Sequence, residues 1–341
     1  MNHFKFKYLT ACIFIFSLST AELHANNWQV VQELKGEWKF RIGDNMSWRQ
    51  PAYNDSNWDR IRVPAAWETQ GFHAYDGYGW YRKSFTLNSN QGLTNLYLSL
   101  GYIDDADEVY LNGKLIGFSG AFPPYYRTAY NAYRRYPIPK ELLLPKGENV
   151  IAVRTYDAKL DGGIITGMVA IVYHPDNDML DIDLSGVWNF RLGDQLSWKN
   201  PTASREKWEK TMVPSFWEKQ GFSDYDGYAW YFRQFYLPAR LENEELVLLL
   251  GKIDDFDQTY INGQLVGSTG FDEEGNFDPE DIISYSMVRK YHLPNSKLNF
   301  GGMNVLAVRV YDKYIDGGIY AGPIGIIRQQ FYTEFWRKWY N

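Results

Sequence analysis

Two stretches of this sequence combine carboxylates with aromatic side chains. An aromatic face packs against the C–H groups of a ligand ring, and a carboxylate accepts hydrogen bonds from hydroxyl groups, so these stretches could bind a polyhydroxylated molecule. The candidate ligand-binding residues are Trp67, Glu68, Asp76, Tyr78 and Trp80, with Trp217, Glu218, Asp226, Tyr228 and Trp230. For any single residue we favour the structural interpretation, in which the tryptophans fill a core and the Asp-Gly pairs form turns.

A second group of carboxylates has the composition of a calcium site. Three aspartates occupy four positions in each of two segments, and Ca²⁺ takes clustered oxygen ligands. The candidate ligands are Asp104, Asp105 and Asp107, with Asp254, Asp255 and Asp257. Neither segment has the ligand spacing of a dedicated calcium loop, so we favour strand-end capping for them. Apart from this structural calcium ion, the sequence predicts no cofactor.

Carboxylate pairs could also act as the acid and nucleophile of a glycosidase. Glu68 with Asp76, or Asp157 with Asp161, would then face each other across a cleft at about 5 to 9 Å. Such pairs are common in acidic proteins, so we rank catalysis below binding and assign no catalytic residue. The sequence contains no Ser-His-Asp, P-loop or histidine-rich metal motif.

These residues recur because the chain contains an internal duplication. A shift of 150 positions aligns Gly36–Asp44 with Gly186–Asp194 and continues without a gap to Gly120 and Gly270. The copies realign at Tyr136 and Tyr291 with a shift of 155, because the second copy has five more residues there. A polar linker at residues 174–178 separates them, which predicts domains at residues 28–177 and 180–341.

The patterns within each copy predict short strands. Apolar Trp38, Phe40 and Ile42 alternate with polar neighbours, which is typical of half-buried strands. The pairs Asn112-Gly113 and Asn262-Gly263 follow such strands and predict hairpins with type I′ turns. Many short strands separated by Gly and Pro predict an all-β fold with two antiparallel sheets packed face to face in each copy.

Four ordered motifs in the first copy carry a family resemblance. They are Trp80-Tyr81-Arg82-Lys83-Ser84-Phe85, Asn112-Gly113-Lys114-Leu115-Ile116-Gly117, Asn149-Val150-Ile151-Ala152-Val153 and Asp161-Gly162-Gly163-Ile164. Each copy resembles the jelly-roll, galactose-binding-like domain of glycoside hydrolase family 2, which includes β-galactosidases and β-glucuronidases, and of sialate O-acetylesterase-like proteins. The resemblance implies two tandem jelly-roll β-sandwiches and a role in handling sugars.

The resemblance also adds site residues and exposes two departures. In some members the loop after the Asn-x-x-Ala-Val strand carries an acidic residue that reaches the sugar, which implies Asp161 and Asp316. Asp157 and Asp312, at the start of the same loops, are further candidate ligand-binding residues. The family's catalytic barrel takes about 250 residues, and two sandwiches occupy this chain, so we expect no barrel here. In the second copy, Arg233 is displaced by one position from the match of Arg82, which predicts that it points to the other face of its strand.

The N-terminus has the pattern of a secretory signal peptide. Lys5 and Lys7 precede an apolar run that is too short to span a bilayer, and small residues follow it. Cleavage could follow Ala21 or Ala25, and we favour Ala25 because the globular pattern begins after it, which predicts a secreted or periplasmic protein with no membrane span. Cleavage would remove Cys12, the only cysteine, and leave a net charge of −7, which disfavours nucleic acid as a partner.

Three hypotheses for function follow. The first is a secreted, non-catalytic carbohydrate-binding protein that binds an oligo- or polysaccharide and serves as an accessory to a separate glycosidase. The second is a glycoside hydrolase that acts through carboxylates at the ends of the sandwiches. The third is an interaction or sensory module that has lost the sugar. A further hypothesis concerns the loop before Tyr136, where Arg134 and Arg135 would dock against an acidic loop at residues 272–281 of the other copy.

Overall fold

The computed structural model describes residues 28–87, 95–175, 177–222, 225–272, 275–277 and 280–340. The expected signal peptide, with Cys12, lies outside these ranges. Among the residues described, no helix has both the length and the apolar character that crossing a membrane requires.

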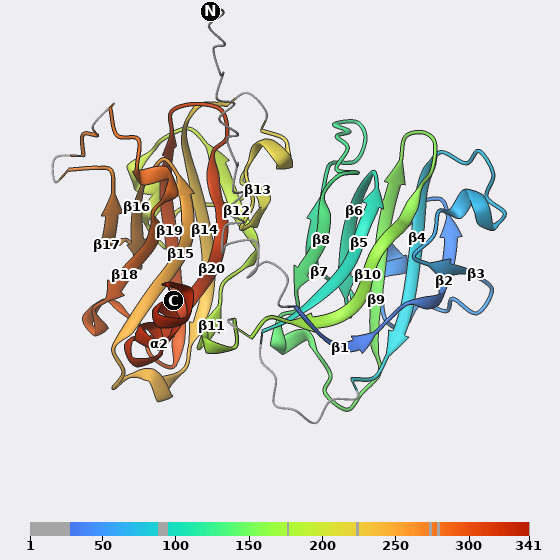
Figure 1. The fold of residues 1–341 in the computed structure, drawn as a ribbon, viewed down its shortest axis with the longest axis horizontal. Helices are drawn as coiled ribbons and strands as arrows, with labels where there is room; N and C mark the ends of the chain where they lie inside the picture. The colour runs from blue at the N-terminus through green and yellow to red at the C-terminus, as the bar shows by residue number, and fades with distance from the viewer. Residues whose placement is uncertain are drawn as a thin grey trace, which may run out of the picture.

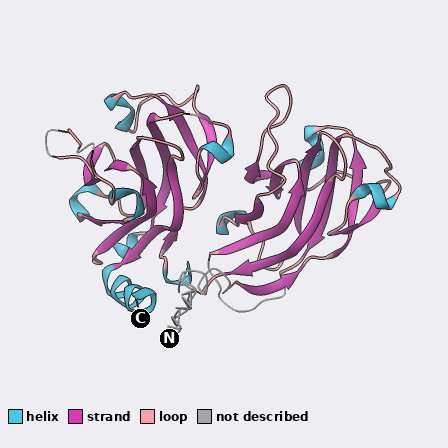
Figure 2. Ribbon diagram, turned by 45° about the horizontal axis from the view of Figure 1, so that its top comes forward, coloured by secondary structure: helices cyan, strands magenta, loops and turns pink. Residues whose placement is uncertain are grey.

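Each repeat folds into two antiparallel sheets that pack face to face, so the described residues form two β-sandwiches (Figure 1). In the first repeat the strand orders are β1-β10-β5-β8 and β3-β2-β4-β9-β6-β7. In the second they are β11-β20-β15-β18 and β13-β12-β14-β19-β16-β17. The order is the same in both repeats, and strands dominate both units (Figure 2). The prediction of two tandem all-β sandwiches is therefore confirmed.

The elements have the following bounds. The strands of the first repeat are β1 (Gln29–Glu33), β2 (Gly36–Ile42), β3 (Asp59–Val63), β4 (Gly77–Phe85), β5 (Leu96–Asp104), β6 (Ala106–Leu111), β7 (Lys114–Ser119), β8 (Tyr133–Pro137), β9 (Asn149–Asp157) and β10 (Gly163–Tyr173). Those of the second are β11 (Ile182–Asp183), β12 (Gly186–Leu192), β13 (Glu209–Val213), β14 (Gly227–Leu237), β15 (Leu246–Asp254), β16 (Phe256–Ile261), β17 (Gln264–Thr269), β18 (Val288–Leu293), β19 (Gly302–Asp312) and β20 (Gly318–Arg328). The helix α2 (Gln329–Tyr340) ends the chain, and the short 3₁₀ turns are η1 (Met46–Arg49), η2 (Trp67–Gln70), η3 (Lys140–Leu142), η4 (Asn177–Met179), η5 (Leu196–Lys199), η6 (Glu218–Gln220), η7 (Ala239–Leu241), η8 (Ser284–Ser286) and η9 (Asn295–Lys297).

Local sequence explains these elements. In β2, Trp38 and Phe40 are buried while Lys39 between them is not, as the period of two predicts, but Ile42 at the end of the strand is exposed. Asn112 and Gly113 have φ angles of 49° and 80°, and Asn262 and Gly263 repeat them at 50° and 83°. Both residues of a type I′ turn need positive φ, so the hairpin predictions are confirmed.

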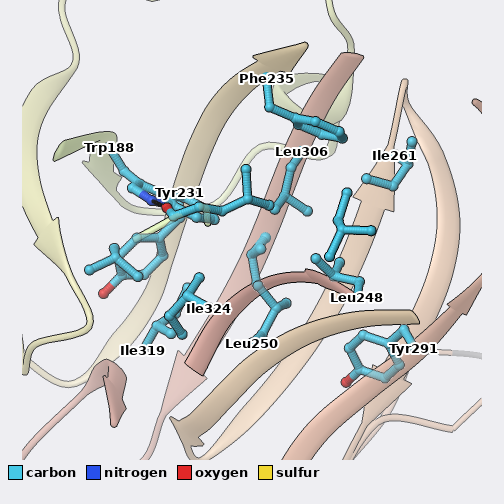
Figure 3. Close-up of a cluster of buried hydrophobic side chains, with 14 of the residues drawn as sticks. Trp188, Tyr231, Phe235, Leu248, Leu250, Ile261, Tyr291, Leu306, Ile319 and Ile324 are labelled. Carbon is cyan, nitrogen blue, oxygen red and sulfur yellow. Dashed lines mark hydrogen bonds between the residues drawn. The ribbon is translucent and has the colours of Figure 1, made fainter. Parts of the chain in front are cut away.

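Each sandwich encloses its own hydrophobic core between its two sheets. In the second repeat, Trp188, Tyr231, Leu248, Leu250 and Ile324 meet from both sheets (Figure 3). The first repeat buries an equivalent cluster around Trp38, Tyr81, Leu98, Leu100 and Ile171. Burial of apolar side chains is the main favourable term in folding, at about 1.5 to 3 kcal/mol for a fully buried Leu or Ile. Each repeat therefore has the means to fold as a unit.

The two sandwiches also contact each other along their edges. Strand β7 of the first repeat lies beside β12 and β13 of the second. The Tyr97 hydroxyl donates to Asp183 at 2.7 Å, and Met212 packs against the core of the first repeat. Gly221 lies against the Arg127 guanidinium, where a Cβ would meet it at 1.7 Å. The Arg127 side chain of the first repeat therefore packs closely against the backbone of Gly221 in the second.

A guanidinium group occupies the same place in both repeats but comes from different positions. Arg82 pairs with Asp55 at 2.7 Å, whereas in the second repeat Arg205 stands at the position of Asp55 and Phe232 at that of Arg82. The Arg205 guanidinium lies over the Phe232 ring, 4.0 Å from its centre. Arg82 donates to the main-chain carbonyls of Trp48, Gln50 and Tyr53. Arg205 donates to the carbonyls at the matching positions, which belong to Trp198, Asn200 and Ala203.

Arg233, the residue displaced by one position from the match of Arg82, takes the place of Lys83 instead. Lys83 donates to the carbonyl of Glu37, and Arg233 donates to the carbonyl of Val187, which is the matching residue. The displacement therefore does not remove the guanidinium from the second repeat, because Arg205 supplies it.

The Phe232–Arg205 arrangement of the second repeat should also be tolerated in the first repeat, in place of Arg82 and Asp55. Arg82→Phe alone leaves Asp55 and buried carbonyls without their donor, so we expect a loss of about 1 to 3 kcal/mol in the free energy of unfolding. Adding Asp55→Arg copies the arrangement of the second repeat and should recover most of that loss. Urea unfolding of both variants tests this, and a double variant no more stable than the single one would contradict it.

The domain boundaries also remain a prediction. We expect residues 28–177, expressed alone, to give a soluble domain that unfolds cooperatively in urea, because its core is complete within the repeat. Loss of the contacts to the second repeat should lower its stability without abolishing folding. A product with no cooperative transition would show that the two repeats depend on a shared interface.

Candidate functional site

Most of the candidate carboxylates gather at one end of each sandwich. We call rim 1 the end of the first sandwich that is formed by η2, the β5–β6 junction, the β7–β8 loop and the β9–β10 loop. Rim 2 is its counterpart in the second repeat, formed by η6 and the connections β15–β16, β17–β18 and β19–β20. In an antiparallel sandwich these connections come from different strands of both sheets, so residues far apart in sequence meet there.

A buried arginine holds rim 1 together. The Arg134 side chain in β8 is fully buried, and its Nε donates to Asp107 in β6 at 2.7 Å. Its Nη2 donates to the main-chain carbonyl of Asp105 at 2.9 Å, and its Nη1 donates to the carbonyls of Ala129 and Ala132 in the β7–β8 loop. One guanidinium therefore ties a strand, the β5–β6 junction and a loop to each other.

Rim 2 has the same anchor. The Arg289 Nε donates to Asp257 at 2.9 Å, and both side chains are fully buried. The same guanidinium donates to the carbonyls of Asp255, Ser284 and Met287. In each rim a tyrosine completes the arrangement, because the hydroxyls of Tyr136 and Tyr291 donate to the same aspartates. Arg134 therefore does not dock against the loop at residues 272–281, since it is the buried partner of Asp107.

The same finding corrects the predicted calcium ligands. Asp107 and Asp257 face the core as counter-ions of Arg134 and Arg289. They lie inside β6 and β16, whereas the other candidate aspartates lie at the junction before these strands. The carboxylates that do come together are Asp104, Asp105 and Asp157 in rim 1 and Asp254, Asp255 and Asp312 in rim 2. Within each group, one oxygen atom from each residue lies within 4.8 Å of the others. These clusters could hold a metal ion.

Asp105 is the best-supported member of its cluster. Its carboxylate accepts from the hydroxyls of Tyr126 at 2.6 Å and Thr128 at 2.5 Å, and from the main-chain N–H of Ala158 at 3.0 Å. Asp157 ends β9 and is fully buried, and its Oδ1 accepts from the N–H of Lys159 at 3.0 Å. Its Oδ2 is buried and accepts no hydrogen bond from the described residues.

Burial and mutual repulsion shift the pKa values of these clusters. Burial, with the neighbouring Asp105, raises the pKa of Asp104 to about 7, and burial with Asp105, Glu68 and Asp76 raises that of Asp157 to about 6. In rim 2 the same causes raise the pKa of Asp254 to about 8 and that of Asp312 to about 7. Burial is the largest cause in all four residues, so their ionised forms are disfavoured relative to an exposed aspartate.

The glutamates predicted from the Trp-Glu pairs hold the loops of the rims. Glu68 accepts from the N–H of Gly162 at 2.9 Å, and Glu218 accepts from the N–H of Gly317 at 2.9 Å. Burial raises the pKa of Glu68, and it raises that of Glu218 to about 7. Each glutamate therefore fixes the backbone of the loop that follows β9 or β19.

The predicted tryptophans lie in the interior. The Trp67 and Trp217 rings are fully buried beneath Gly162 and Gly317, where a Cβ would come within 2.3 and 2.0 Å of the indole. Trp80 and Trp230 are also fully buried, in clusters with Trp48 and Trp58 or with Trp208 on the outer face of each six-stranded sheet. As placed here, none of these four rings offers a free face to a ligand.

The remaining predicted residues divide between the sheet face and the loop tips. Tyr78 and Tyr228 are half-buried on the sheet, where Arg154 and Arg309 lie over their rings at 4.8 and 4.2 Å. Asp76, Asp226 and Asp161 are exposed, and Asp316 is half-buried. The exposed carboxylates therefore lie on the loops that surround each cluster.

Exposed apolar side chains, which sequence reasoning did not single out, complete the rims. Leu160 and Ile315 are 79% and 82% exposed at the tips of the β9–β10 and β19–β20 loops. Tyr125 in rim 1 and Tyr314 in rim 2 are 85% and 73% exposed. A carboxylate beside an exposed aromatic ring is what recognition of a hydroxylated ring requires.

Comparisons with known proteins relate this chain to β-galactosidases and β-glucuronidases, both by a family model and by sequence identity. A family model described as the β-galactosidase second all-β domain matches residues 43–161. A β-glucuronidase of Streptococcus agalactiae serotype V is 30% identical over 128 residues, which are 36% of this chain and 20% of that protein. A β-galactosidase of Priestia megaterium is 27% identical over 157 residues, 37% of this chain and 14% of that protein. The crystal structure of Bacteroides uniformis β-glucuronidase aligns with 87% of this chain and 28% of its own, at 16% identity and a TM-score of 0.37.

The chain therefore carries all-β domains similar to those of glycoside hydrolase family 2 β-galactosidases and β-glucuronidases. The family match lies within the first repeat, and the duplication relates the second repeat to it. This chain spans a fifth or less of the length of these two curated relatives.

The buried anchor of rim 1 can be tested by mutation. Arg134→Met leaves Asp107 buried without its counter-ion, so we expect a loss of about 3 to 5 kcal/mol in the free energy of unfolding. Arg134→Met combined with Asp107→Leu removes both charges and should recover most of the loss. Denaturant unfolding measures both. A single variant that loses less than about 1 kcal/mol would contradict the role of this ion pair.

Proposed function

We propose that this chain is a secreted, non-catalytic carbohydrate-binding protein whose two rims bind an oligo- or polysaccharide. The observation that carries the proposal is that the Asp161 and Asp316 carboxylates each follow an exposed apolar side chain at a loop tip, Leu160 or Ile315, in both rims. Asp161 is exposed beside Leu160 and accepts no side-chain hydrogen bond from the described residues, and Asp316 follows Tyr314 and Ile315. Such carboxylates accept hydrogen bonds from sugar hydroxyls, while the apolar groups pack on the C–H faces of the ring.

The loops that carry these carboxylates are held in place before any ligand arrives. The N–H groups of Gly162 and Gly317 are bound by Glu68 and Glu218, each next to a fully buried tryptophan. A site that is already ordered loses less conformational entropy on binding. The similarity to β-galactosidases and β-glucuronidases, whose names state that they act on sugars, supports the same ligand class.

The fold of the described residues favours sugar binding without hydrolysis. Their strands make four antiparallel sheets, with no (β/α)₈ barrel among them, and the carboxylates of each rim come from a single sandwich. In this proposal the chain acts beside a separate glycosidase. The expected location is outside the cytoplasm, after cleavage of residues 1–25, with domains at residues 28–177 and 180–341. A structural calcium ion, bound by the acidic clusters, is the one kind of cofactor that we expect.

A second function, glycoside hydrolysis, is favoured by one observation. Burial raises the pKa of Glu218 to about 7, and a general acid must hold its proton near neutral pH. A hydrolase would also need a second carboxylate across the sugar at about 5 to 9 Å.

One experiment separates these functions. The mature protein is screened on an array of oligo- and polysaccharides while hydrolysis of aryl glycosides is measured in parallel. Binding without sugar release is the expected result. Release of free sugar would replace the proposal with the hydrolase. Neither binding nor release would leave an interaction or sensory module as the remaining hypothesis.

Asp161 gives the sharpest mutational test of the proposed site. Asp161→Ala removes an acceptor for sugar hydroxyls and should weaken binding by about 1 to 3 kcal/mol, with little change in melting temperature. Asp59→Ala, at an exposed position at the start of β3, is the matched control and should change neither. Isothermal titration with the sugar found on the array measures the difference. Unchanged affinity with a lower melting temperature would show that Asp161 is structural.

A further inference from the structure

We propose that each rim binds one hard divalent cation, with Ca²⁺ as the best match, through Asp104, Asp105 and Asp157 in rim 1 and through Asp254, Asp255 and Asp312 in rim 2. Two of the aspartates in each set lie at the junction of β5 with β6 or of β15 with β16, and the third ends β9 or β19. This inference is independent of sugar binding, because it rests only on these carboxylates.

The third carboxylate of each set points to a missing ligand. Asp157 and Asp312 are fully buried, and in both residues Oδ1 accepts a main-chain N–H while Oδ2 is buried without a partner. A buried carboxylate oxygen that accepts no hydrogen bond destabilises the folded protein by the full free energy of its desolvation. One oxygen of each of these residues lies within 4.8 Å of an oxygen from each of the other two aspartates, so a cation held among the three carboxylates would contact this buried group.

The neighbouring arginines do not supply the missing charge. Arg134 lies close to rim 1, but its guanidinium is occupied by the Asp107 carboxylate and by the carbonyls of Asp105, Ala129 and Ala132. Arg289 is committed in the same way in rim 2. Among the ion pairs formed by the described residues, none includes an aspartate of either set.

The chemistry of the ligands selects the cation. Every proposed ligand is a carboxylate oxygen, and oxygen ligands suit Ca²⁺, Mg²⁺ and Mn²⁺ rather than Zn²⁺ or Cu²⁺. Rigid octahedral geometry favours Mg²⁺, whereas Ca²⁺ accepts irregular sets that are completed by water. Three carboxylates from two connections form an irregular set, so Ca²⁺ fits best.

The duplication is a second argument, because the surroundings of the two sets differ. Thr128 and Tyr126 hold Asp105, whereas the corresponding loop of the second repeat has a different sequence and length. The N–H groups that bind Asp105 and Asp255 belong to Ala158 and Lys313, which also differ. Three carboxylates and a buried unpartnered oxygen nevertheless recur in both rims.

Calcium titration of the full mature chain tests the proposal. The protein is treated with EDTA, desalted and titrated with CaCl₂ by isothermal calorimetry, and melting is compared in calcium and in EDTA. We expect two ions per chain, a dissociation constant on the order of 10⁻³ M or tighter, as in extracellular calcium modules, and a higher melting temperature in calcium.

Variants assign the ions to the residues. Asp157→Asn and Asp312→Asn should each reduce the stoichiometry to one ion, and the double variant should bind none. Both replacements relieve repulsion between carboxylates, so in EDTA the variants should melt no lower than the unaltered protein, which shows that they are folded. Asp161→Asn removes one charge from rim 1 outside the proposed set and should leave two ions bound.

Either of two results would overturn the proposal. One is the absence of heat and of any melting shift with the unaltered protein at about 10 mM CaCl₂, well above that affinity range. The other is a stoichiometry of two that persists in the double variant.

Discussion

The geometry of both rims depends on one interaction, the buried ion pair between an arginine of β8 or β18 and an aspartate of β6 or β16. Arg134 and Arg289 each join the two sheets of their sandwich. Each also donates to the main-chain carbonyl of the residue between β5 and β6 or between β15 and β16, which is Asp105 or Asp255. A buried pair of this kind adds little net stability compared with apolar packing, but it is costly to break. Its evident consequence here is positional, because it fixes where the paired aspartates of each rim stand.

The duplication shows which interactions the fold requires and which can be exchanged. The Arg–Asp–Tyr arrangement and the glutamate that holds the following loop occur in both repeats at matching positions. The guanidinium that binds the carbonyls near Trp48 or Trp198 also occurs in both, but it comes from Arg82 in one and Arg205 in the other. The physical requirement is a donor for those buried carbonyls, and two sequences satisfy it in different ways.

Most of the fold could be predicted from the sequence because its signals are local. The period-two pattern around Trp38 and the Asn112-Gly113 turn depend on neighbouring residues and were confirmed. The site was harder, because its contacts are not local. Asp107 is two residues from Asp105 yet faces the core, while Asp157, 52 residues further on, completes the cluster. The two residues of the Trp-Glu pair also have different roles. Trp67 is buried beneath Gly162, whereas Glu68 accepts a hydrogen bond from the N–H of Gly162.

The central claim is that the rims, rather than the faces of the sheets, bind the ligand. A crystal structure of the mature chain with its bound sugar tests this most directly. The account predicts sugar density within hydrogen-bonding distance of the Asp161 or Asp316 carboxylate, beside the exposed tips of the β9–β10 or β19–β20 loops. Density confined to the outer face of a six-stranded sheet, over Tyr78 and Arg154 or over Tyr228 and Arg309, would contradict it.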